Sequence, residues 1–343
     1  MEKIQNIIIG SKNYPNIKSS LLSNNKRFNI NKVKNRKYDD VKKYLSKFKN
    51  LNFNFEEKTN NDRKENIKLL GLTNKSTDVE VKKLGLGLNY NAYYPTSKAY
   101  NLSDFKITSN IKIPKYVEKI VNDELKANKA LKMLYNKGFD SHYLSQIFST
   151  SNLGIKSNRK FVPTKWSITS IDDSLSKYNT ENLQREISDF MFFEGKYLKN
   201  RYFIFILPGK FEFEFFEILL KDKKIISDFE SIFGRKKYAF KTAGGYYAAK
   251  FAVSEYLKTN KKHGKVVVLR FIEPDYTSLG VWVVRQGVKE SFKHKKSFNS
   301  LKEMLVYTKI YKEEHISLYF AEVLAKSKLL NNYKKQTLLS QYT

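Results

Sequence analysis

The chain has 343 residues, enough for about two domains with a sizeable core. Hydrophobic residues make up 41% and aromatic residues 15%, too many for a disordered chain despite a mean hydropathy of −0.55. The absence of cysteine excludes disulfides, thiolate nucleophiles and cysteine-based metal sites, and the four histidines form no i, i+4 pair. Since no apolar run approaches the ~18 residues of a transmembrane helix, we expect a soluble cytoplasmic protein without membrane contact.

The charge balance is strongly basic: 64 Lys and Arg against 34 Asp and Glu give a net charge of +30. A field of this size favours an anionic partner, and nucleic acid is the usual one. We therefore expect contacts made mostly to phosphates rather than to base edges. The alternative is that A/T-rich codons produced the lysine excess, since only nine of the 64 basic residues are arginine.

The first 70 residues are polar and basic, with 17 Lys and Arg, seven Asp and Glu and 14 Asn. Apolar spacing within Lys26 to Asn50 predicts one helix, and the Asn-rich stretches around it predict loops of low local stability. The Leu-Gly-Leu-Gly-Leu run from Leu84 to Leu88 contains only GxG, a weak nucleotide-binding signal that favours a loop between elements. We then predict a single helix that begins at Pro114 and ends at Gly138.

The second half of the chain mixes helical and strand-like periods. We predict an amphipathic helix from about Asn182 to Leu198, followed by a β-hairpin of strands 202–207 and 211–215 around a Pro-Gly turn. Further predicted elements are strands at 265–272 and 280–285, a helix at 243–257, and a helix begun by a capping box at Ser300 and Glu303. The sequence therefore predicts an α+β fold of helices packed on a small, largely antiparallel sheet, with a flexible C-terminal tail.

A polar stretch from Val162 to Asp173 gathers a cation, an indole, hydroxyls and two carboxylates. Adjacent aspartates can share a divalent cation through their oxygens, and the metal could activate water, so Asp172 and Asp173 are candidate catalytic residues. The alternative is that one of them caps the next helix. The residue pattern leaves open whether the protein is an enzyme.

Two glycines, Gly244 and Gly245, stand at the expected start of the 243–257 helix. Glycines at a helix start let backbone N–H groups approach a phosphate, and Arg235 and Lys250 could add charged hydrogen bonds. The alternative is tight packing of a small-residue helix against the sheet. The basic run Lys289 to Lys296 suits a phosphate track or a solvated loop.

The C-terminus carries Gln336, Leu339 and Tyr342 at intervals of three residues. In a 3₁₀ turn these positions share one face, and the spacing matches the Q-x-x-[ILM]-x-x-[FY] box by which peptides bind a DNA polymerase sliding clamp, the PCNA-interacting (PIP) motif. A second match, Gln184 to Phe190, lies inside the predicted amphipathic helix, where its apolar residues are needed for the core. The terminal match follows a polar linker at a chain end, so we take it as the clamp-binding tail, residues 336–343.

Several of these stretches together resemble the archaeal Nre family of DNA repair proteins. The most specific are Asn158–Thr169 with the two following aspartates, Gly244–Ala249, Gly280–Arg285 and the terminal box. The resemblance spans nearly the whole chain and implies DNA damage repair with clamp binding through that box. It also implies an N-terminal region, 1–235, and a C-terminal region, 236–343. The candidate nucleic-acid or phosphate site comprises Arg159, Lys165, Trp166, Arg235, Gly244, Gly245, Lys250 and Arg285.

The chain departs from the family pattern at three points: it lacks the cysteine zinc motif of some members, has Lys165 where arginine is usual, and ends its box in Tyr342-Thr343 rather than in two aromatics. We predict a repair factor recruited to DNA by the sliding clamp (PCNA), with no cofactor and no metal. One alternative is a metal-dependent, nuclease-like DNA-processing enzyme that uses Asp172 or Asp173. Another is an RNA- or ribosome-associated binding protein with an accidental terminal box.

Overall fold

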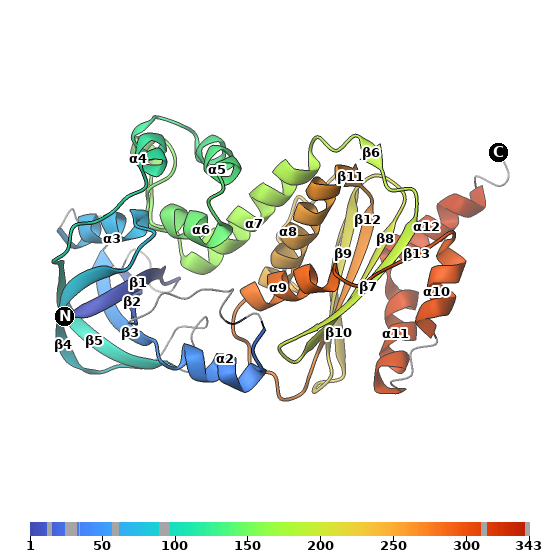
Figure 1. The fold of residues 1–343 in the computed structure, drawn as a ribbon, viewed down its shortest axis with the longest axis horizontal. Helices are drawn as coiled ribbons and strands as arrows, with labels where there is room; N and C mark the ends of the chain where they lie inside the picture. The colour runs from blue at the N-terminus through green and yellow to red at the C-terminus, as the bar shows by residue number, and fades with distance from the viewer. Residues whose placement is uncertain are drawn as a thin grey trace. The chain divides into compact units, whose positions relative to one another are not determined.

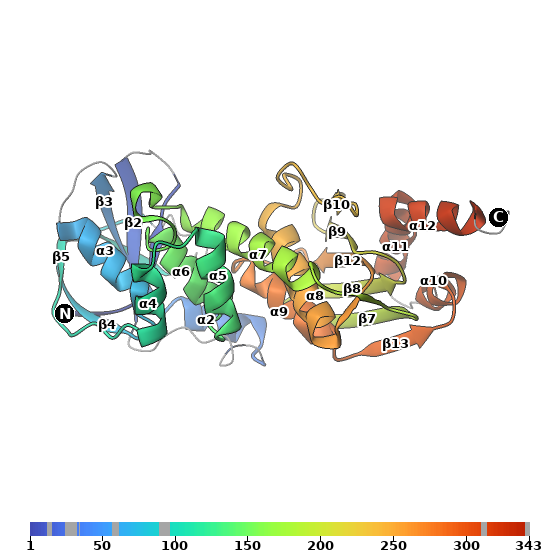
Figure 2. The ribbon, with the colours of Figure 1, turned by 90° about the horizontal axis from the view of Figure 1, so that it is seen from above.

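The computed structural model describes residues 1–11, 16–24, 33, 35–56, 62–88, 97–309 and 314–339. The chain forms two compact units: unit 1 is Met1–Ser174 with Ser278–Gly280, and unit 2 is Leu175–Thr277 with Val281–Thr343. Both units mix helices and strands (Figures 1 and 2), so the α+β prediction is confirmed. Within the described ranges, no helix has the length and apolar character to cross a lipid bilayer.

Unit 1 begins with a closed barrel of five strands in the order β1-β2-β3-β5-β4. The β3–β5 pair is parallel and the other described pairs are antiparallel. The strands and intervening helices are β1 (Glu2–Ile9), β2 (Asn16–Ser23), α2 (Tyr38–Leu45), β3 (Lys49–Glu56), α3 (Asp62–Leu72), β4 (Thr77–Leu86) and β5 (Lys98–Ile107).

The barrel encloses apolar side chains at alternate positions of its strands, such as Leu51, Phe53 and Phe55 of β3. The expectation of mostly loops over this region is therefore wrong. Among the Asn-rich residues, Asn52 and Asn54 of β3 face outward between the buried aromatics. The apolar residues of β3 alternate with a period of two, but the asparagines between them made this strand pattern hard to recognise in the sequence.

Helices follow the barrel in unit 1: α4 (Lys115–Asn122), α5 (Ala127–Asn136), α6 (Ser141–Ser149), the 3₁₀ turn η1 (Lys156–Asn158) and α7 (Thr164–Thr180), which continues into unit 2. The single helix predicted from Pro114 to Gly138 is two, because the poor helix formers Asn122 and Asp123 end α4. Gly138 ends α5 as predicted, with a positive φ of 92° that favours glycine.

Unit 2 is built on a six-stranded sheet in the order β10-β9-β12-β8-β7-β13. Helices α8 and α9 cover one face and α10, α11 and α12 the other (Figure 1). Its elements are β6 (Arg185–Glu186), β7 (Phe190–Tyr197), β8 (Asn200–Leu207), β9 (Glu212–Leu219), β10 (Lys224–Glu230), α8 (Ala243–Asn260), β11 (Lys262–His263), β12 (Lys265–Ile272), α9 (Trp282–Ser291), β13 (Lys295–Phe298), α10 (Leu301–Lys309), α11 (Glu314–Lys326) and α12 (Lys328–Leu339).

Three predictions in this unit are wrong. The chain from 182 to 198 forms β6 and β7 rather than a helix, and Met191, Phe192 and Phe193 are buried in the sheet. Strands β8 and β9 do not form a hairpin, because β12 lies between them, antiparallel to β8 and parallel to β9. The β-branched stretch predicted as a strand at 280–285 forms the start of α9, since packing outweighs intrinsic propensity.

The other predicted elements are confirmed. Strand β12 and helix α8 begin and end close to their predicted bounds. The capping residue of α10 is Ser300, whose Oγ accepts a hydrogen bond from the Glu303 N–H at 3.1 Å. The Glu303 carboxylate in turn accepts one from the Asn299 N–H.

Candidate nucleic-acid interface

The segment between β10 and α8, residues 231–242, is a loop that carries apolar rings and lysines at its surface. We call it the β10–α8 loop. Phe233 is 88% exposed and Phe240 77%, and Ile232 and Tyr238 are also exposed. Three lysines alternate with these side chains and are exposed as well: Lys236, Lys237 and Lys241. Rings beside cations on one surface are the chemistry that holds single-stranded nucleic acid, since bases stack on rings and phosphates pair with ammonium groups.

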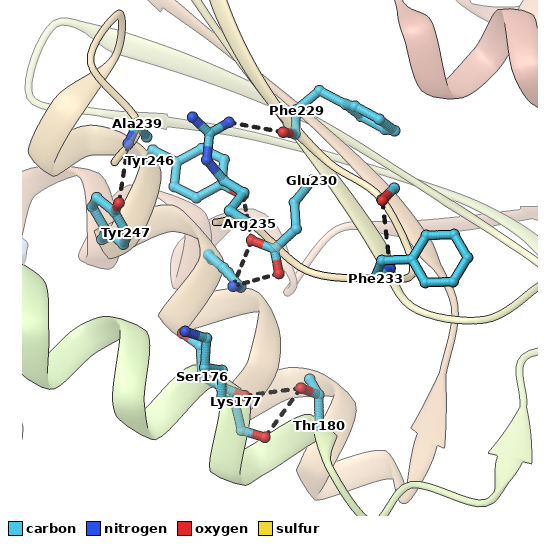
Figure 3. A network of polar contacts seen from close by, with 12 residues as sticks. Ser176, Lys177, Thr180, Phe229, Glu230, Phe233, Arg235, Ala239, Tyr246 and Tyr247 are labelled. Atoms are coloured by element: carbon cyan, nitrogen blue, oxygen red, sulfur yellow. Dashed lines mark hydrogen bonds and ion pairs between the residues drawn. The ribbon is translucent and has the colours of Figure 1, made fainter. Parts of the chain in front are cut away.

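Arg235 fixes the shape of this loop from within (Figure 3). Its guanidinium donates to the Phe229 carbonyl at 2.7 Å and to the Lys237 and Tyr238 carbonyls at 3.1 Å each. It also forms an ion pair with Asp228 at 3.0 Å. These bonds use the guanidinium donors inside the protein, so Arg235 positions the loop and its neighbouring lysines present the outward charge.

The start of α8, where the sequence suggests a phosphate site, holds an internal carboxylate. Asp228 accepts hydrogen bonds from the Thr242 N–H at 2.8 Å and from the Thr242 hydroxyl at 2.9 Å. A carboxylate near a helix N-terminus is favourable for the same reasons as a phosphate there. In this structure the α8 terminus therefore anchors the loop to β10.

Lys250 lies one layer deeper, on the face of α8 that packs against the sheet. It is 1% exposed, and its ammonium donates to both oxygens of Glu230 at 2.7 and 2.8 Å. The Tyr246 hydroxyl donates to the same carboxylate at 2.7 Å (Figure 3). Burial, with the adjacent Glu230 charge, raises the pKa of Tyr246 well above its ordinary value, so the phenol stays a proton donor.

The two glycines of α8 have different surroundings. A Cβ on Gly245 would lie 2.6 Å from a Glu217 oxygen and 3.1 Å from the Phe215 ring, so this residue allows α8 to approach β9 closely. Gly244 is partly exposed. Close helix–sheet packing, the alternative that the sequence left open, thus describes Gly245.

Arg235 pairs with Asp228, and Lys250 pairs with Glu230. Tyr246 joins the two pairs, since its ring lies under the Arg235 guanidinium and its hydroxyl donates to Glu230. Gly245 packs beside them, against β9. Arg285 lies on α9 with its guanidinium 5.5 Å from the centre of the Phe251 ring, and Phe251 belongs to α8. The exposed Phe233 and Phe240 were missed by the sequence analysis. Their alternation with lysines between Ile232 and Lys241 is visible in the sequence, but only the structure shows that the rings are exposed.

The remaining members of the predicted site lie in unit 1. Trp166 is 55% exposed in the first turn of α7, and the Lys165 ammonium lies 5.9 Å from the centre of its ring. Arg159 donates to the Gly154 carbonyl at 2.8 Å and to the Val121 carbonyl at 2.6 Å, and burial lowers its pKa. Arg159 therefore holds backbone segments of unit 1 together.

Both candidate catalytic aspartates lie in the middle of α7. Asp172 is buried and Asp173 is partly exposed. Neither begins a helix, so the capping alternative is wrong. Within the part of the chain that the structure describes, no three His, Cys, Asp or Glu side chains are grouped to hold a metal ion.

The terminal box lies at the edge of the described chain. Gln336 and Leu339 belong to the last turns of α12, with side chains outside those described, and Tyr342 lies outside the described residues. The expected polar linker before the box is also part of α12. The N-terminus of that helix is fixed by the buried Glu214 carboxylate, which accepts from the Ser327 hydroxyl and from the Lys328 and Leu329 N–H groups.

The basic run 289–296 is partly paired. Lys289 of α9 forms an ion pair with Glu255 at 2.7 Å, and Lys293 pairs with Glu290. Lys295 and Lys296 are exposed on the edge strand β13. The run is therefore the end of a helix and the start of a strand rather than one loop.

Two family models together match nearly the whole chain: archaeal Nre, N-terminal, at residues 5–224 and archaeal Nre, C-terminal, at 230–342. DNA repair protein NreA of Archaeoglobus fulgidus is 34% identical over 64% of this chain and 58% of its own length. NreA of Haloferax volcanii is 30% identical over 54% of this chain and 48% of its own length. NreB of A. fulgidus is 31% identical over 66% of this chain and 59% of its own length. The matches thus span about half the length of these relatives, and no solved structure matches. The chain belongs to the archaeal Nre family.

Proposed function

We propose that this chain is a DNA repair factor that binds DNA through the β10–α8 loop and other lysine-rich surface, and that the sliding clamp recruits it through the terminal box. The names of its relatives supply the repair role. The exposed rings of Phe233 and Phe240 beside lysines carry the DNA contact. Because their loop is braced by Arg235, the rings are held ready for a base without a large ordering cost.

The DNA contact is tested on the full chain with labelled random-sequence DNA at several salt concentrations. Phe240→Ser should weaken binding by about 1–3 kcal/mol if the ring stacks on a base. The matched control is Leu318→Ser, which removes a similarly exposed apolar side chain from α11. Equal loss in both variants would remove the loop from the proposal.

The phosphate contact is tested by charge reversal. Lys237→Glu should lower the slope of log affinity against log salt by about one or more, whereas Lys221→Glu, an equal change on an exposed turn, should alter it less. A wild-type plot that is flat in salt would contradict DNA binding through phosphates. Tighter binding to RNA of the same sequence would favour the RNA-binding alternative.

The clamp contact rests on the spacing of Gln336, Leu339 and Tyr342. Calorimetry against the organism's purified sliding clamp should give micromolar affinity that is lost when residues 336–343 are removed. Leu339→Ala and Tyr342→Ala should each cost ~2 kcal/mol or more, because a short peptide depends on few anchors. Thr337→Ala is the control and should be nearly neutral. Unchanged binding after removal of the tail would contradict clamp recruitment through this box.

A further inference from the structure

The barrel of unit 1 has a strand order with a known use in nucleic-acid binding. Five strands close in the order β1-β2-β3-β5-β4, with β3 and β5 parallel and α3 between β3 and β4. A five-stranded Greek-key barrel of this kind is the oligonucleotide/oligosaccharide-binding (OB) fold, whose ligands lie across strands 2 and 3. Because fold alone does not establish function, the chemistry of that surface has to carry the inference.

The outer surface over β2, β3 and the start of β5 is rich in amides and carries the exposed cation Lys18 and the exposed carboxylate Glu56. We call it the amide face, and it comprises Lys18, Ser20, Asn52, Asn54 and Asn101, all exposed or partly exposed. These residues are neighbours by register: Lys18 lies opposite Asn54, Ser20 opposite Asn52, and Asn52 opposite Asn101. Amides and hydroxyls both donate and accept, so they suit base edges and sugar–phosphate oxygens.

The other exposed surface of the barrel, over β4 and the rest of β5, is different. Glu80 lies opposite Lys106, and Lys82 lies opposite Asp104, so acidic and basic side chains match across the two strands. Such a surface is already neutralised. Residues 1–107 carry 22 Lys and Arg against 10 Asp and Glu, which gives the barrel region a positive field overall. The amide face instead offers mainly uncharged donors and acceptors, which suit the polar groups of an anionic strand attracted by this positive field.

A row of exposed leucines borders the amide face. Leu84, Leu86 and Leu88, the leucine ridge, are 71, 81 and 69% exposed. The side chains of the amide face hold its backbone: the Asn52 amide donates to the Leu88 carbonyl at 3.0 Å and the Asn101 amide to the Leu86 carbonyl at 3.4 Å. Leucine at every second residue with glycine between places three apolar side chains together in solvent, which marks an interaction surface.

We infer that the amide face and the leucine ridge form a binding site for single-stranded DNA, separate from the β10–α8 loop of unit 2. A duplex stacks its bases inside and offers phosphates and groove edges, whereas a single strand also exposes apolar base faces. A leucine ridge beside a surface of amides and a hydroxyl offers apolar contacts for base faces and hydrogen-bonding groups for base edges and the sugar–phosphate chain. The inference rests on the proposed function only in taking DNA as the nucleic acid.

The test uses the full chain and fluorescence anisotropy with a labelled oligodeoxythymidine of about 16 nucleotides, a duplex of equal length, and oligouridine. Asn54→Asp and Leu86→Ser each change one exposed side chain, on the amide face and the leucine ridge respectively. Each should weaken single-strand binding about tenfold and leave duplex binding within about twofold. The matched control is Asn74→Asp, an equal change of charge at an exposed turn before β4. Thermal melts of all three variants should match the wild type.

Several results would overturn the inference. They are equal wild-type affinity for single strand and duplex, equal effects of Asn54→Asp and Asn74→Asp, or tighter binding of oligouridine than of oligodeoxythymidine. A wild-type chain that binds no DNA would instead contradict the proposed function. A chain whose DNA binding responds to Phe240→Ser but to neither barrel variant would keep the proposed function and remove only this site.

Discussion

The two units of this protein differ in where their lysine and arginine side chains lie. In the described part of unit 1 no lysine or arginine is buried, and the barrel core is apolar. Unit 2 buries cations and pairs them: Lys250 with Glu230, Lys265 with Glu212, and Arg270 with Glu217. Each of these pairs is neutral and adds nothing to the net charge of +30, so that charge is carried by the other residues. The barrel keeps its lysines and arginines at or near the surface.

The largest effect should come from breaking a buried pair of unit 2. Lys250→Met removes the ammonium and leaves the Tyr246 hydroxyl as the described hydrogen-bond donor to the buried Glu230, and we expect a loss of about 3–5 kcal/mol in the free energy of unfolding. Urea denaturation measures it. Lys289→Met breaks the more exposed pair with Glu255 and should cost at most about 1 kcal/mol. Similar losses in both variants, which lie in the same unit, would contradict a larger stabilising role for the buried pair.

A smaller effect on stability should come from adding a side chain at Gly245, where α8 packs closely against β9. Gly245→Ala places a methyl group against Glu217 and Phe215, and we expect a destabilisation of about 1–3 kcal/mol because the Glu217 carboxylate, which accepts a hydrogen bond from Arg270, has to shift. Gly244→Ala, one residue earlier and partly exposed, should be neutral or slightly stabilising. The midpoints of thermal unfolding of the two variants give the comparison, and equal midpoints would contradict the close packing.

The smallest effect should come from the barrel's own ion cluster. Burial alone would raise the pKa of Glu2, but hydrogen bonds from Lys83, Ser23 and Lys49 outweigh it and lower the pKa below its ordinary 4.5. A lowered carboxyl pKa stabilises the fold above the unfolded value and loses that effect as pH falls through the folded value. Glu2→Gln should therefore cost no more than about 1 kcal/mol at neutral pH.

The same variant gives a pH test of the cluster. The difference in unfolding free energy between wild type and Glu2→Gln should shrink as pH falls below about 4.5. Denaturation curves at a series of pH values measure this. A difference that stays constant or grows toward acid would show that Glu2 is not stabilised as a carboxylate.

The sequence predicted long, strongly patterned elements and missed what depends on distant partners. Strand β12 and helix α8 followed from local pattern, and Ser300 from capping chemistry. The alternation of Phe213, Glu214 and Phe215 also predicted a strand. In the structure Glu214 is buried, because it binds the start of α12 more than a hundred residues later. No local pattern contains that partner.

The candidate site shows the same limit. Arg235, Gly245 and Lys250 could be selected from residue type, and the structure places Arg235 and Lys250 in one network and Gly245 against β9. Their partners Asp228 and Glu230 come from the preceding strand and explain why these charges are internal. The barrel of unit 1 was missed for another reason: polar residues between Leu51, Phe53 and Phe55 lowered the average hydropathy without disturbing the period.

The position of β12 in the sheet has a consequence for how the chain folds during synthesis. Strands β8 and β9 are made early, but neither can complete its pairing until residues 265–272 arrive and lie between them. Until then each has an open edge of aromatic and aliphatic residues, which can pair with other chains. The sheet therefore contains residues from both family matches, since β9 lies in the N-terminal match and β12 in the C-terminal match. A fragment that stops before Ile272 should aggregate rather than fold.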